Sequence, residues 1–342
     1  MTATRTRRTA RAGNTTPNTT TILDLFAGPG GWSHALRTLG LADVGIELDP
    51  AACATRRAAG HATLRADVAA LPVAQFKGKV KGLIGSPPCQ GMSRGGTRAG
   101  WADIETIAAL LAGLAKGRDT RTGYAGTVAD PRSLLIAEPL RYALAACPEW
   151  VACEQVPAVL PLWQETARHL QEAGYSTWTG VLDAADYGLG QNRRRAFLIA
   201  SRTRRVHQPA PTHAQHPDGP DALFGPTRKA WVSMAEAIGW GATDRPAPTV
   251  TSGGARTGGA EPFPTSARNT LRKTRESGAW KPRPATDSLR PSPADAAALQ
   301  GFPPDYPWQG AQGKAYEQIG NAVPPPLARA VLAVATGNEA DA

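Results

Sequence analysis

The sequence predicts an α/β protein with an open, doubly wound sheet and a second, smaller domain that is rich in loops. Three observations support this prediction. Between residues 21 and 201, short apolar runs alternate with amphipathic stretches, a pattern typical of parallel βαβ units with helices on both faces of a sheet. The first apolar run leads directly into a glycine-rich turn. After residue 201 the periodic apolar runs give way to Pro, Gly, Thr and Arg.

The individual elements follow from their local patterns. Apolar runs predict strands over 21–26, 43–48, 81–86, 150–156, 176–184 and 195–201, and amphipathic spacing predicts helices over 31–40, 50–60, 133–147 and 162–174. A further apparent strand is closed by Asp67 in the stretch RADVAAL. Residues 293–302 and 326–336 are again helical in pattern, so we expect the C-terminus to return to the first domain.

These patterns divide the chain into segments. We expect a disordered basic tail over 1–20, a first domain over 21–201, a second domain over 202–286 and a C-terminal return over 287–336. Within the first domain, residues 94–133 are too long for a simple connection, so they predict a mobile loop with its own short helix.

The positive charge is concentrated in two places. The formal net charge is +10; residues 1–20 carry four Arg and no acid, and residues 202–290 carry 14 Lys or Arg against seven Asp or Glu. A GC-rich coding sequence would account for many Arg residues, but not for their uneven placement. A near-neutral body joined to a basic segment indicates a polyanionic partner, of which nucleic acid is the obvious one.

The four cysteines, Cys53, Cys89, Cys147 and Cys153, form no CxxC pair and have no His at ligand spacing. We therefore expect neither a metal site nor a disulfide framework, and a cytoplasmic location fits best. The N-terminus has no apolar run, and no stretch of about 18 apolar residues occurs anywhere. These features predict neither a signal peptide nor a membrane partner.

The stretch LDLFAGPGGWS at 23–33 indicates a ligand site. A strand runs into Gly28, Gly30 and Gly31, and a helix follows; such a turn lets a ligand approach the backbone. Glu47 closes the next strand, where an acid can bind ribose hydroxyls. A tight turn beside a solvated carboxylate is the alternative, but the combination favours a nucleotide-type ligand. Ser33 stands where the dinucleotide fingerprint has Gly, which disfavours a dinucleotide.

Four side chains lie near the carboxyl ends of predicted strands, where open α/β sheets bind their ligands; they are Asp24, Glu47, Asp67 and Cys89. Cys89 follows two prolines in LIGSPPCQGMS, which end the strand and place the thiol on a stiff turn. A lone cysteine is most often a small apolar side chain, and Asp67 alone is more often a turn or cap residue. Together they predict one crevice for a nucleoside-like ligand and a cysteine.

The motifs LDLFAGPGG, GIELD, GSPPCQGMS, CEQV, QNRRR and QIGNAVPPPLA occur in the order and spacing of the DNA cytosine-5 methyltransferases. The chain resembles this family, in its bacterial or phage type, over residues 21–201 and 287–334. The resemblance implies a Rossmann-like methyltransferase domain that uses S-adenosylmethionine. The intervening residues 202–286 fall where the family carries its variable target-recognition domain, which is also where the charge excess lies.

The resemblance implies a chemistry that needs these residues. Carbon 5 of cytosine is a poor nucleophile, and addition of a thiolate from Cys89 to carbon 6 makes it an enamine that can accept a methyl group. Glu154 in CEQV is the implied proton donor at ring nitrogen 3, a role that a raised pKa favours. Arg193 and Arg195 of QNRRR are implied to position the base. The family more often has Asn where this chain has Gln155, and Val-Pro where it has Leu189 and Gly190.

The resemblance also implies the binding residues. The S-adenosylmethionine set is Phe26, Gly28, Gly30, Glu47, Asp67, Pro87, Asn321 and Val323. The DNA set is Gln90, Ser93 and Arg94 at the hinge of the loop, with Arg256, Arg268, Arg272 and Lys273 in the recognition segment. Each of these basic residues, taken alone, also fits a solvated charge.

The expected function is methylation of carbon 5 of a cytosine flipped out of double-stranded DNA, within a specific short sequence, by a monomer. A cognate restriction endonuclease is an expected partner. Two alternatives stay open. The same chemistry on RNA or a free nucleotide would not need a long basic segment. A non-catalytic DNA-binding relative would have lost Cys89, Glu154 or the glycines, all of which are present.

Overall fold

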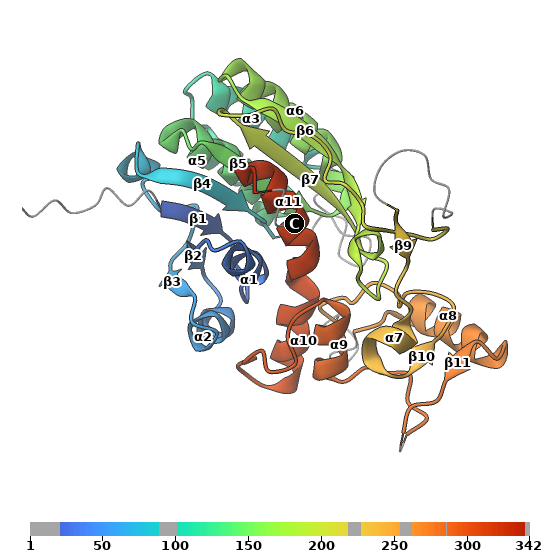
Figure 1. The fold of residues 1–342 in the computed structure, drawn as a ribbon. Helices are drawn as coiled ribbons and strands as arrows, with labels where there is room; N and C mark the ends of the chain where they lie inside the picture. The colour runs from blue at the N-terminus through green and yellow to red at the C-terminus, as the bar shows by residue number, and fades with distance from the viewer. Residues whose placement is uncertain (1–20, 89–100, 218–226, 254–261, 285, 339–342) are drawn as a thin grey trace, which may run out of the picture.

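The computed structural model describes residues 21–88, 101–217, 227–253, 262–284 and 286–338. A seven-stranded sheet with the order β3-β2-β1-β4-β5-β7-β6 forms its centre (Figure 1). The strands are β1 Thr21–Leu25, β2 Asp43–Glu47, β3 Ala62–Arg65, β4 Val80–Gly85, β5 Trp150–Gln155, β6 Ser176–Asp183 and β7 Arg194–Ser201. The predicted α/β class with an open sheet is confirmed.

One strand departs from the all-parallel expectation. β1 to β5 pair in parallel, whereas β7 runs antiparallel to both of its neighbours, β5 and β6. Only residues 184–193 connect β6 to β7, which is too short for a crossover helix, so the chain must turn back on itself. The consequence matters for the site, because the first residues of β7 lie at the edge where the parallel strands end.

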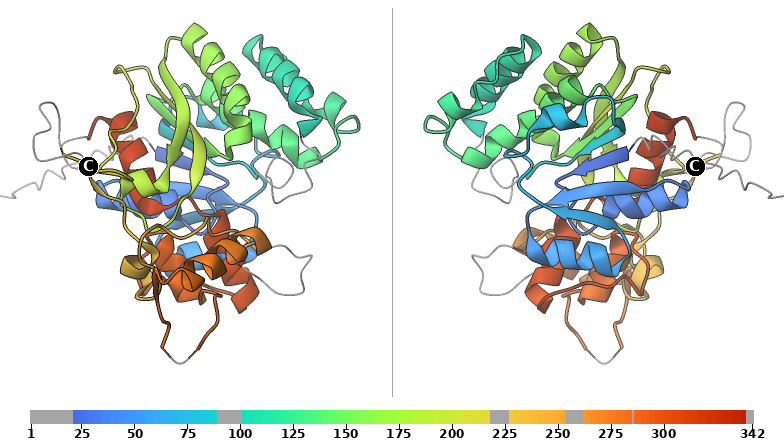
Figure 2. Two further views of the ribbon diagram at one scale, coloured as in Figure 1. Left: turned by 90° about the vertical axis from the view of Figure 1, so that its right-hand side faces the viewer. Right: turned by 90° about the vertical axis from the view of Figure 1, so that its left-hand side faces the viewer.

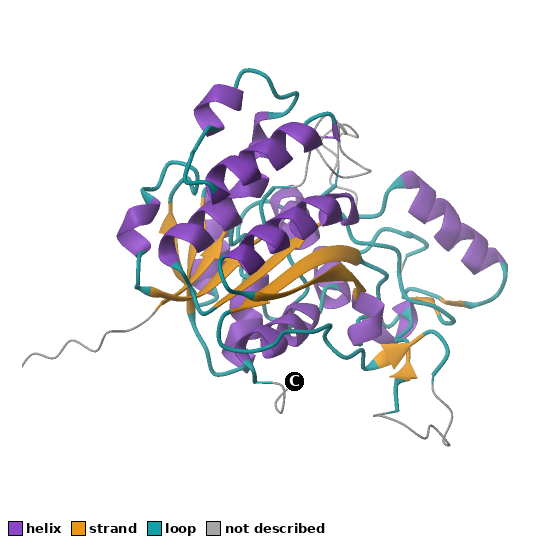
Figure 3. Ribbon diagram, turned by 90° about the horizontal axis from the view of Figure 1, so that it is seen from above, coloured by secondary structure: helices purple, strands orange, loops and turns teal. Residues whose placement is uncertain are grey.

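Alternate residues of the strands serve two hydrophobic cores, as the twofold period of a strand requires. Leu23 of β1 packs in the core beneath α3 Ile104–Ala115, α5 Glu138–Ala146 and α6 Leu160–Glu172. Its neighbour Ile22 packs in the core on the other face, beneath α1 Gly31–Thr38 and α11 Pro325–Thr336. Figures 2 and 3 show helices on both faces of the sheet, with α2 Pro50–Ala58 beside the β2–β3 edge.

The expected loop over 94–133 is largely a packed structure where it is described. α3 contributes the fully buried side chains Ile107, Leu110 and Leu111 to the first core, and α4 Arg121–Tyr124 follows it. The apolar repeat IETIAALLAGLA therefore forms the short helix expected in this segment, and the helix packs into the core. Among the described residues, 3₁₀ segments include η1 Val73–Phe76, η3 Pro131–Ala137, η4 Pro157–Val159 and η5 Ala184–Tyr187.

The segment after β7 forms a smaller unit with its own core. Its elements are β8 His213–Ala214, β9 Lys229–Ala230, α7 Met234–Ile238, β10 Gly241–Ala242, α8 Thr265–Glu276 and β11 Trp280–Lys281. Met234, Trp240 and Phe263 share this core with side chains from α9 Pro293–Leu299 and α10 Gln312–Asn321. The expected boundary at 286/287 thus falls within one hydrophobic core, and α11 returns to the sheet (Figure 1). None of the described helices is long and apolar enough to cross a membrane.

Candidate active site

A cavity of about 280 Å³ opens at the carboxyl ends of the parallel strands. Residues that follow β1, β2, β3 and β4, the end of β5, the start of β7 and one side of α10 line it. Because β7 is antiparallel, its first residues lie beside the end of β5, with Ala196 paired to Gln155. The crevice predicted at the strand ends is therefore present, with polar groups from segments far apart in the sequence.

The turn after β1 is built from unusual backbone conformations. Phe26 and Gly28 have φ of 59° and 53°, in the left-handed region that costs a non-glycine residue free energy. The Gly28 N–H donates to the Glu47 Oε2 at 2.8 Å, which ties the turn to the end of β2. Phe26, Gly28 and Glu47 all line the cavity, so the turn and the acid form one wall.

The next two glycines serve packing. Gly30 has φ of 107°, and a Cβ on it would lie 2.9 Å from both the His61 ring and the Tyr306 hydroxyl; it is not among the cavity-lining residues. A Cβ on Gly31 would lie 2.1 Å from the Val323 carbonyl oxygen. The absence of side chains here allows the C-terminal GNAV segment to close against the glycine turn, and Asn321 and Val323 line the cavity.

The three acids expected at the strand ends have different surroundings. Glu47 accepts hydrogen bonds at its Oε1 from the N–H groups of Leu48 and Asp49, at 2.7 and 2.8 Å. Asp67 lines the cavity, and its Oδ1 accepts from the Ala69 N–H at 2.9 Å. Each carboxylate keeps acceptor capacity for a ligand.

Asp24, by contrast, does not reach the cavity, so its expected place in the crevice is wrong. It is fully buried on the α1 side of the sheet, 3.6 Å from Arg56 Nη1. Arg56 also binds Asp43, at 3.0 Å between Nη2 and Oδ2. Burial, followed by the charge of Asp43, raises the pKa of Asp24 well above its usual range. The alternation along β1 explains the difference, because Asp24 shares its face with Ile22.

Glu154 and Arg195 form an ion pair at the cavity. Glu154 stands near the end of β5, and its Oε1 lies 3.1 Å from the Arg195 Nε on β7. Burial raises the pKa of Glu154, while the charges of Arg195 and Arg193 oppose that shift. A carboxyl group that holds its proton more tightly than usual, beside a cation that orients it, can act as a proton donor.

Arg193 makes a different set of contacts. Its Nη1 donates to the Val250 carbonyl at 2.9 Å, and its Nη2 donates to the carbonyls of Gly320 and Ala322 at 2.8 and 3.0 Å. Only 1% of Arg193 is exposed. It therefore joins the segment around Val250 to the C-terminal GNAV segment, although part of it still lines the cavity.

The backbone that leads to Cys89 is fixed by two side chains. Trp32 Nε1 donates to the Ser86 Oγ at 2.9 Å, and Gln155 Nε2 donates to the Pro87 carbonyl at 2.7 Å. Ser86, Pro87 and the following proline line the cavity. Gln155 thus has a defined packing role where the family more often has Asn. Cys89, Gln90, Ser93, Arg94 and Arg256 lie outside the described residues.

The remaining predicted DNA contacts lie on α8. Leu271 and Thr274 face the third core, while Arg272 and Lys273 are exposed and Arg268 is half-buried.

The structure also adds a cavity residue that the sequence did not indicate, Lys314 of α10, which lies 3.5 Å from Asp49 and 2.8 Å from Glu317. Its position depends on how α10 packs, and no local motif predicts that.

The family model of C-5 cytosine-specific DNA methylases matches residues 20–115, 121–230 and 231–336. The chain belongs to this family. The predicted enzyme class, a DNA (cytosine-5-)-methyltransferase, is confirmed. Type II methyltransferase M.AquIA of Picosynechococcus sp. is 28% identical over 242 residues, 64% of this chain and 87% of the relative. Type II methyltransferase M.NgoMIV of Neisseria gonorrhoeae is 27% identical over 343 residues, 91% of this chain and 95% of the relative.

Solved structures share the fold. The Dnmt2 methyltransferase of S. pombe superposes with a TM-score of 0.61 at 15% identity, covering 93% of this chain and 98% of the other. A putative DNA modification methyltransferase encoded within an E. coli prophage gives a TM-score of 0.54 at 19% identity, covering 94% of this chain and 99% of the other. At these identities the likeness concerns the fold, and it supports the α/β methyltransferase architecture.

Proposed function

We propose that this DNA cytosine methyltransferase takes its methyl group from S-adenosylmethionine and attacks a flipped-out cytosine through Cys89. One observation supports the proposal most strongly. The Glu154–Arg195 pair, the acids Glu47 and Asp67, and the backbone immediately before Cys89 all border the same cavity. A methyl donor and a base must meet in one place for this reaction, and the strand ends supply such a place.

The residues present fit the proposed methyl donor. Glu47 and Asp67 are suited to ribose hydroxyls and an adenine amino group, and the strained turn at Phe26 and Gly28 offers close backbone approach. Asn321 and Val323, which pack against the glycine turn, line the same cavity. When bound, S-adenosylmethionine supplies an electrophilic methyl group. The chain's own residues would hold it, orient it and exclude water.

The base is the second half of the proposed chemistry. The Cys89 thiolate would add to carbon 6 of cytosine while Glu154 gives a proton to nitrogen 3, so that the electron pair of the 5,6 double bond forms a 4,5 double bond and carbon 5 becomes an enamine carbon. Carbon 5 would then bond to the methyl group as the bond from that group to the donor's sulfur breaks, which leaves S-adenosylhomocysteine. Loss of the carbon 5 proton to a base, return of the nitrogen 3 proton to Glu154 and expulsion of the thiolate would restore the aromatic ring. Arg195 would orient the Glu154 carboxyl group through their ion pair.

Double-stranded DNA is the proposed substrate, with the target base flipped at a cost of a few kcal/mol in lost stacking. The basic segment over 202–290 and the exposed cations of α8 support this choice over RNA or a free nucleotide. A monomeric state and a companion restriction endonuclease stay predictions.

The covalent step can be tested by trapping. Duplexes in which cytosine is replaced by 5-fluorocytosine should form a denaturation-resistant adduct with the protein in the presence of S-adenosylmethionine, since fluorine cannot leave as a proton does. The Cys89→Ser variant should form none, and a Cys147→Ser variant, which changes another thiol, should react as the wild type does. An adduct that persists in Cys89→Ser would refute the assigned nucleophile.

A further inference from the structure

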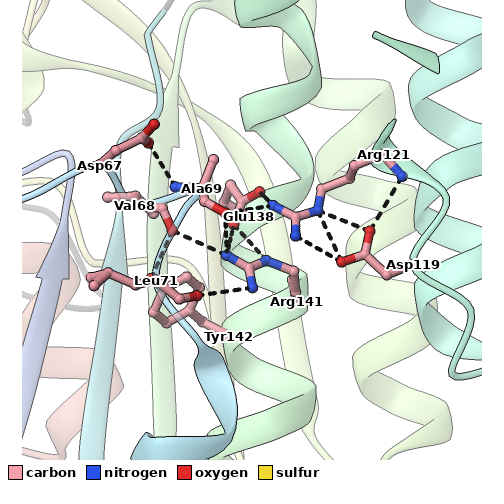
Figure 4. Close-up of polar contacts among 9 residues, drawn as sticks. All are labelled: Asp67, Val68, Ala69, Leu71, Asp119, Arg121, Glu138, Arg141 and Tyr142. Carbon is pink, nitrogen blue, oxygen red and sulfur yellow. Dashed lines mark hydrogen bonds and ion pairs between the residues drawn. The ribbon is translucent and has the colours of Figure 1, made fainter. Parts of the chain in front are cut away.

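The turn that carries Asp67 is held from outside the cavity by a polar network (Figure 4). Arg141 of α5 donates from Nη2 to the carbonyl of Val68 at 3.0 Å and to that of Ala69 at 3.4 Å. The Tyr142 hydroxyl donates to the same Val68 carbonyl at 2.8 Å. These backbone groups follow directly on a residue that borders the cavity, so their positions fix the orientation of its carboxylate.

Ala69 is bound at both of its polar groups. Its N–H donates to the Asp67 Oδ1 at 2.9 Å, and its carbonyl accepts from Arg121 Nη1 at 3.0 Å. The Ala69 N–H belongs to the 68–69 peptide, whose carbonyl Arg141 and Tyr142 hold, and Arg121 holds the carbonyl of the next peptide. A displacement of the Ala69 carbonyl would shift Ala69 as a whole and with it the N–H that holds the Asp67 carboxylate. Arg121 therefore contacts the backbone two residues after the proposed adenine-binding acid.

Arg121 comes from a separate part of the chain, the first residue of α4. Its Nη1 also donates to the Glu138 Oε1 at 2.6 Å, and the Glu138 Oε2 accepts from Arg141 Nε at 2.7 Å. Glu138 is 1% exposed, so this carboxylate joins two guanidinium groups in a buried position. On the solvent side, Asp119 binds the Arg121 Nη2 at 2.7 Å. One arginine thus joins segment 119–124, α5 and the Asp67 turn.

We propose that Arg121 is a positioning residue for the methyl donor, coupling the Asp67 turn to segment 119–124. The proposal rests on the assignment of S-adenosylmethionine to the cavity. Binding at Asp67 favours the turn geometry that Arg121 holds, and by linkage the docking of segment 119–124 strengthens binding at Asp67 by the same factor. Arg121 itself does not touch the ligand, because it is not among the cavity-lining residues.

Isothermal titration with S-adenosylmethionine tests the first half of the proposal. The Arg121→Gln variant should bind about threefold to tenfold more weakly than the wild type, the loss expected for part of a charge-assisted hydrogen bond. Its KM for the donor should rise by a similar factor, while kcat at saturating donor stays within about twofold. Arg121→Lys should recover part of the affinity, because the ammonium keeps the charge but not the fork of donors.

The matched control is Arg168→Gln on α6. Arg168 also binds two carboxylates, Glu165 and Glu172, but on an exposed helix face away from the cavity, and its loss should leave donor affinity unchanged. If Arg121→Gln does not fold, Asp119→Asn gives the same test in milder form, since it leaves the inner bonds of Arg121 in place. Circular dichroism of each variant separates weaker binding from unfolding.

Hydrogen exchange tests the coupling itself. Addition of S-adenosylhomocysteine, the demethylated donor, should slow amide exchange in residues 66–71 and in residues 119–124 of the wild type. In Arg121→Gln, protection should persist in 66–71 and disappear in 119–124. Equal donor affinity in wild type and Arg121→Gln, or undiminished protection of 119–124, would overturn the proposal. A wild-type protein that does not bind S-adenosylmethionine at all would instead refute the cofactor assignment, and the proposal with it.

Discussion

Arg193 and Arg194 are adjacent residues of the same type, but the structure predicts that replacement by methionine destabilises the protein strongly at Arg193 and hardly at all at Arg194. Arg193 is buried and donates to the carbonyls of Val250, Gly320 and Ala322 at 2.8 to 3.0 Å. A hydrogen bond from a charged donor contributes about 1.5–3 kcal/mol, but removal of a buried charge also recovers its desolvation cost. We expect Arg193→Met to lower the free energy of unfolding by about 3–5 kcal/mol, because three buried carbonyls would each lose a partner at about 1–3 kcal/mol and the recovered desolvation offsets part of that sum.

The loss expected for Arg193→Met is a large share of the free energy of unfolding, which is only about 5–15 kcal/mol for a whole domain. Arg194 is exposed on β7, so Arg194→Met should change the free energy of unfolding by less than about 0.5 kcal/mol. Urea unfolding followed by circular dichroism measures both values. Equal stabilities of the two variants would show that the three carbonyl contacts do not hold the recognition segment to the C-terminal segment, and the reasoning would fail.

Three further predictions concern the site and its surroundings. Glu154→Gln should lower kcat by about 10²- to 10⁴-fold, the usual share of a general acid. Burial raises the pKa of Glu154, and the proposed reaction needs its protonated form, so wild-type activity should fall as the pH rises through that pKa. If the activity of Glu154→Gln fell with rising pH in the same way, Glu154 would not be the proton donor. Gly320→Ala should destabilise the protein by about 1–3 kcal/mol in urea unfolding, because its Cβ would lie 2.2 Å from the backbone nitrogen of Ser252; Gly126→Ala, with open space around it, is the control. Replacement of Arg268, Arg272 and Lys273 by alanine should make DNA binding less sensitive to salt. The slope of the logarithm of the binding constant against the logarithm of the salt concentration should fall in magnitude by up to about 2.7, and an unchanged slope would show that α8 does not contact DNA.

Much of the fold could be predicted because strand and helix periods are local. The run TILDL places an apolar side chain on each face, Ile22 on one and Leu23 and Leu25 on the other, which indicates a strand covered on both sides, and the structure confirms it. The antiparallel direction of β7 was not predicted, since direction depends on the length and path of the β6–β7 connection rather than on the strand itself. Within residues 94–133 a short helix was expected, and α3 is that helix; its burial in the first core was not expected, because the Gly- and Arg-rich residues before and after IETIAALLAGLA dominate the segment.

The candidate site shows the same division. Glu47 and Asp67 could be placed at the cavity because an acid at the last residue of a strand, or within two residues of it, must lie near the strand's end. Asp24 is one residue before the end of β1, and that single step turns its side chain to the α1 face. The partners of Arg193 lie 57 to 129 residues away in the chain, so only the tertiary fold reveals that it joins two segments.

The most direct test of the central claim is bisulfite sequencing of DNA from cells that express the protein, with Cys89→Ser expressed to the same level as the control. The proposed mechanism predicts new 5-methylcytosine at every copy of one short sequence in wild-type cells and none in the variant. Absence of new 5-methylcytosine in any sequence context, with the protein present and folded, would contradict it.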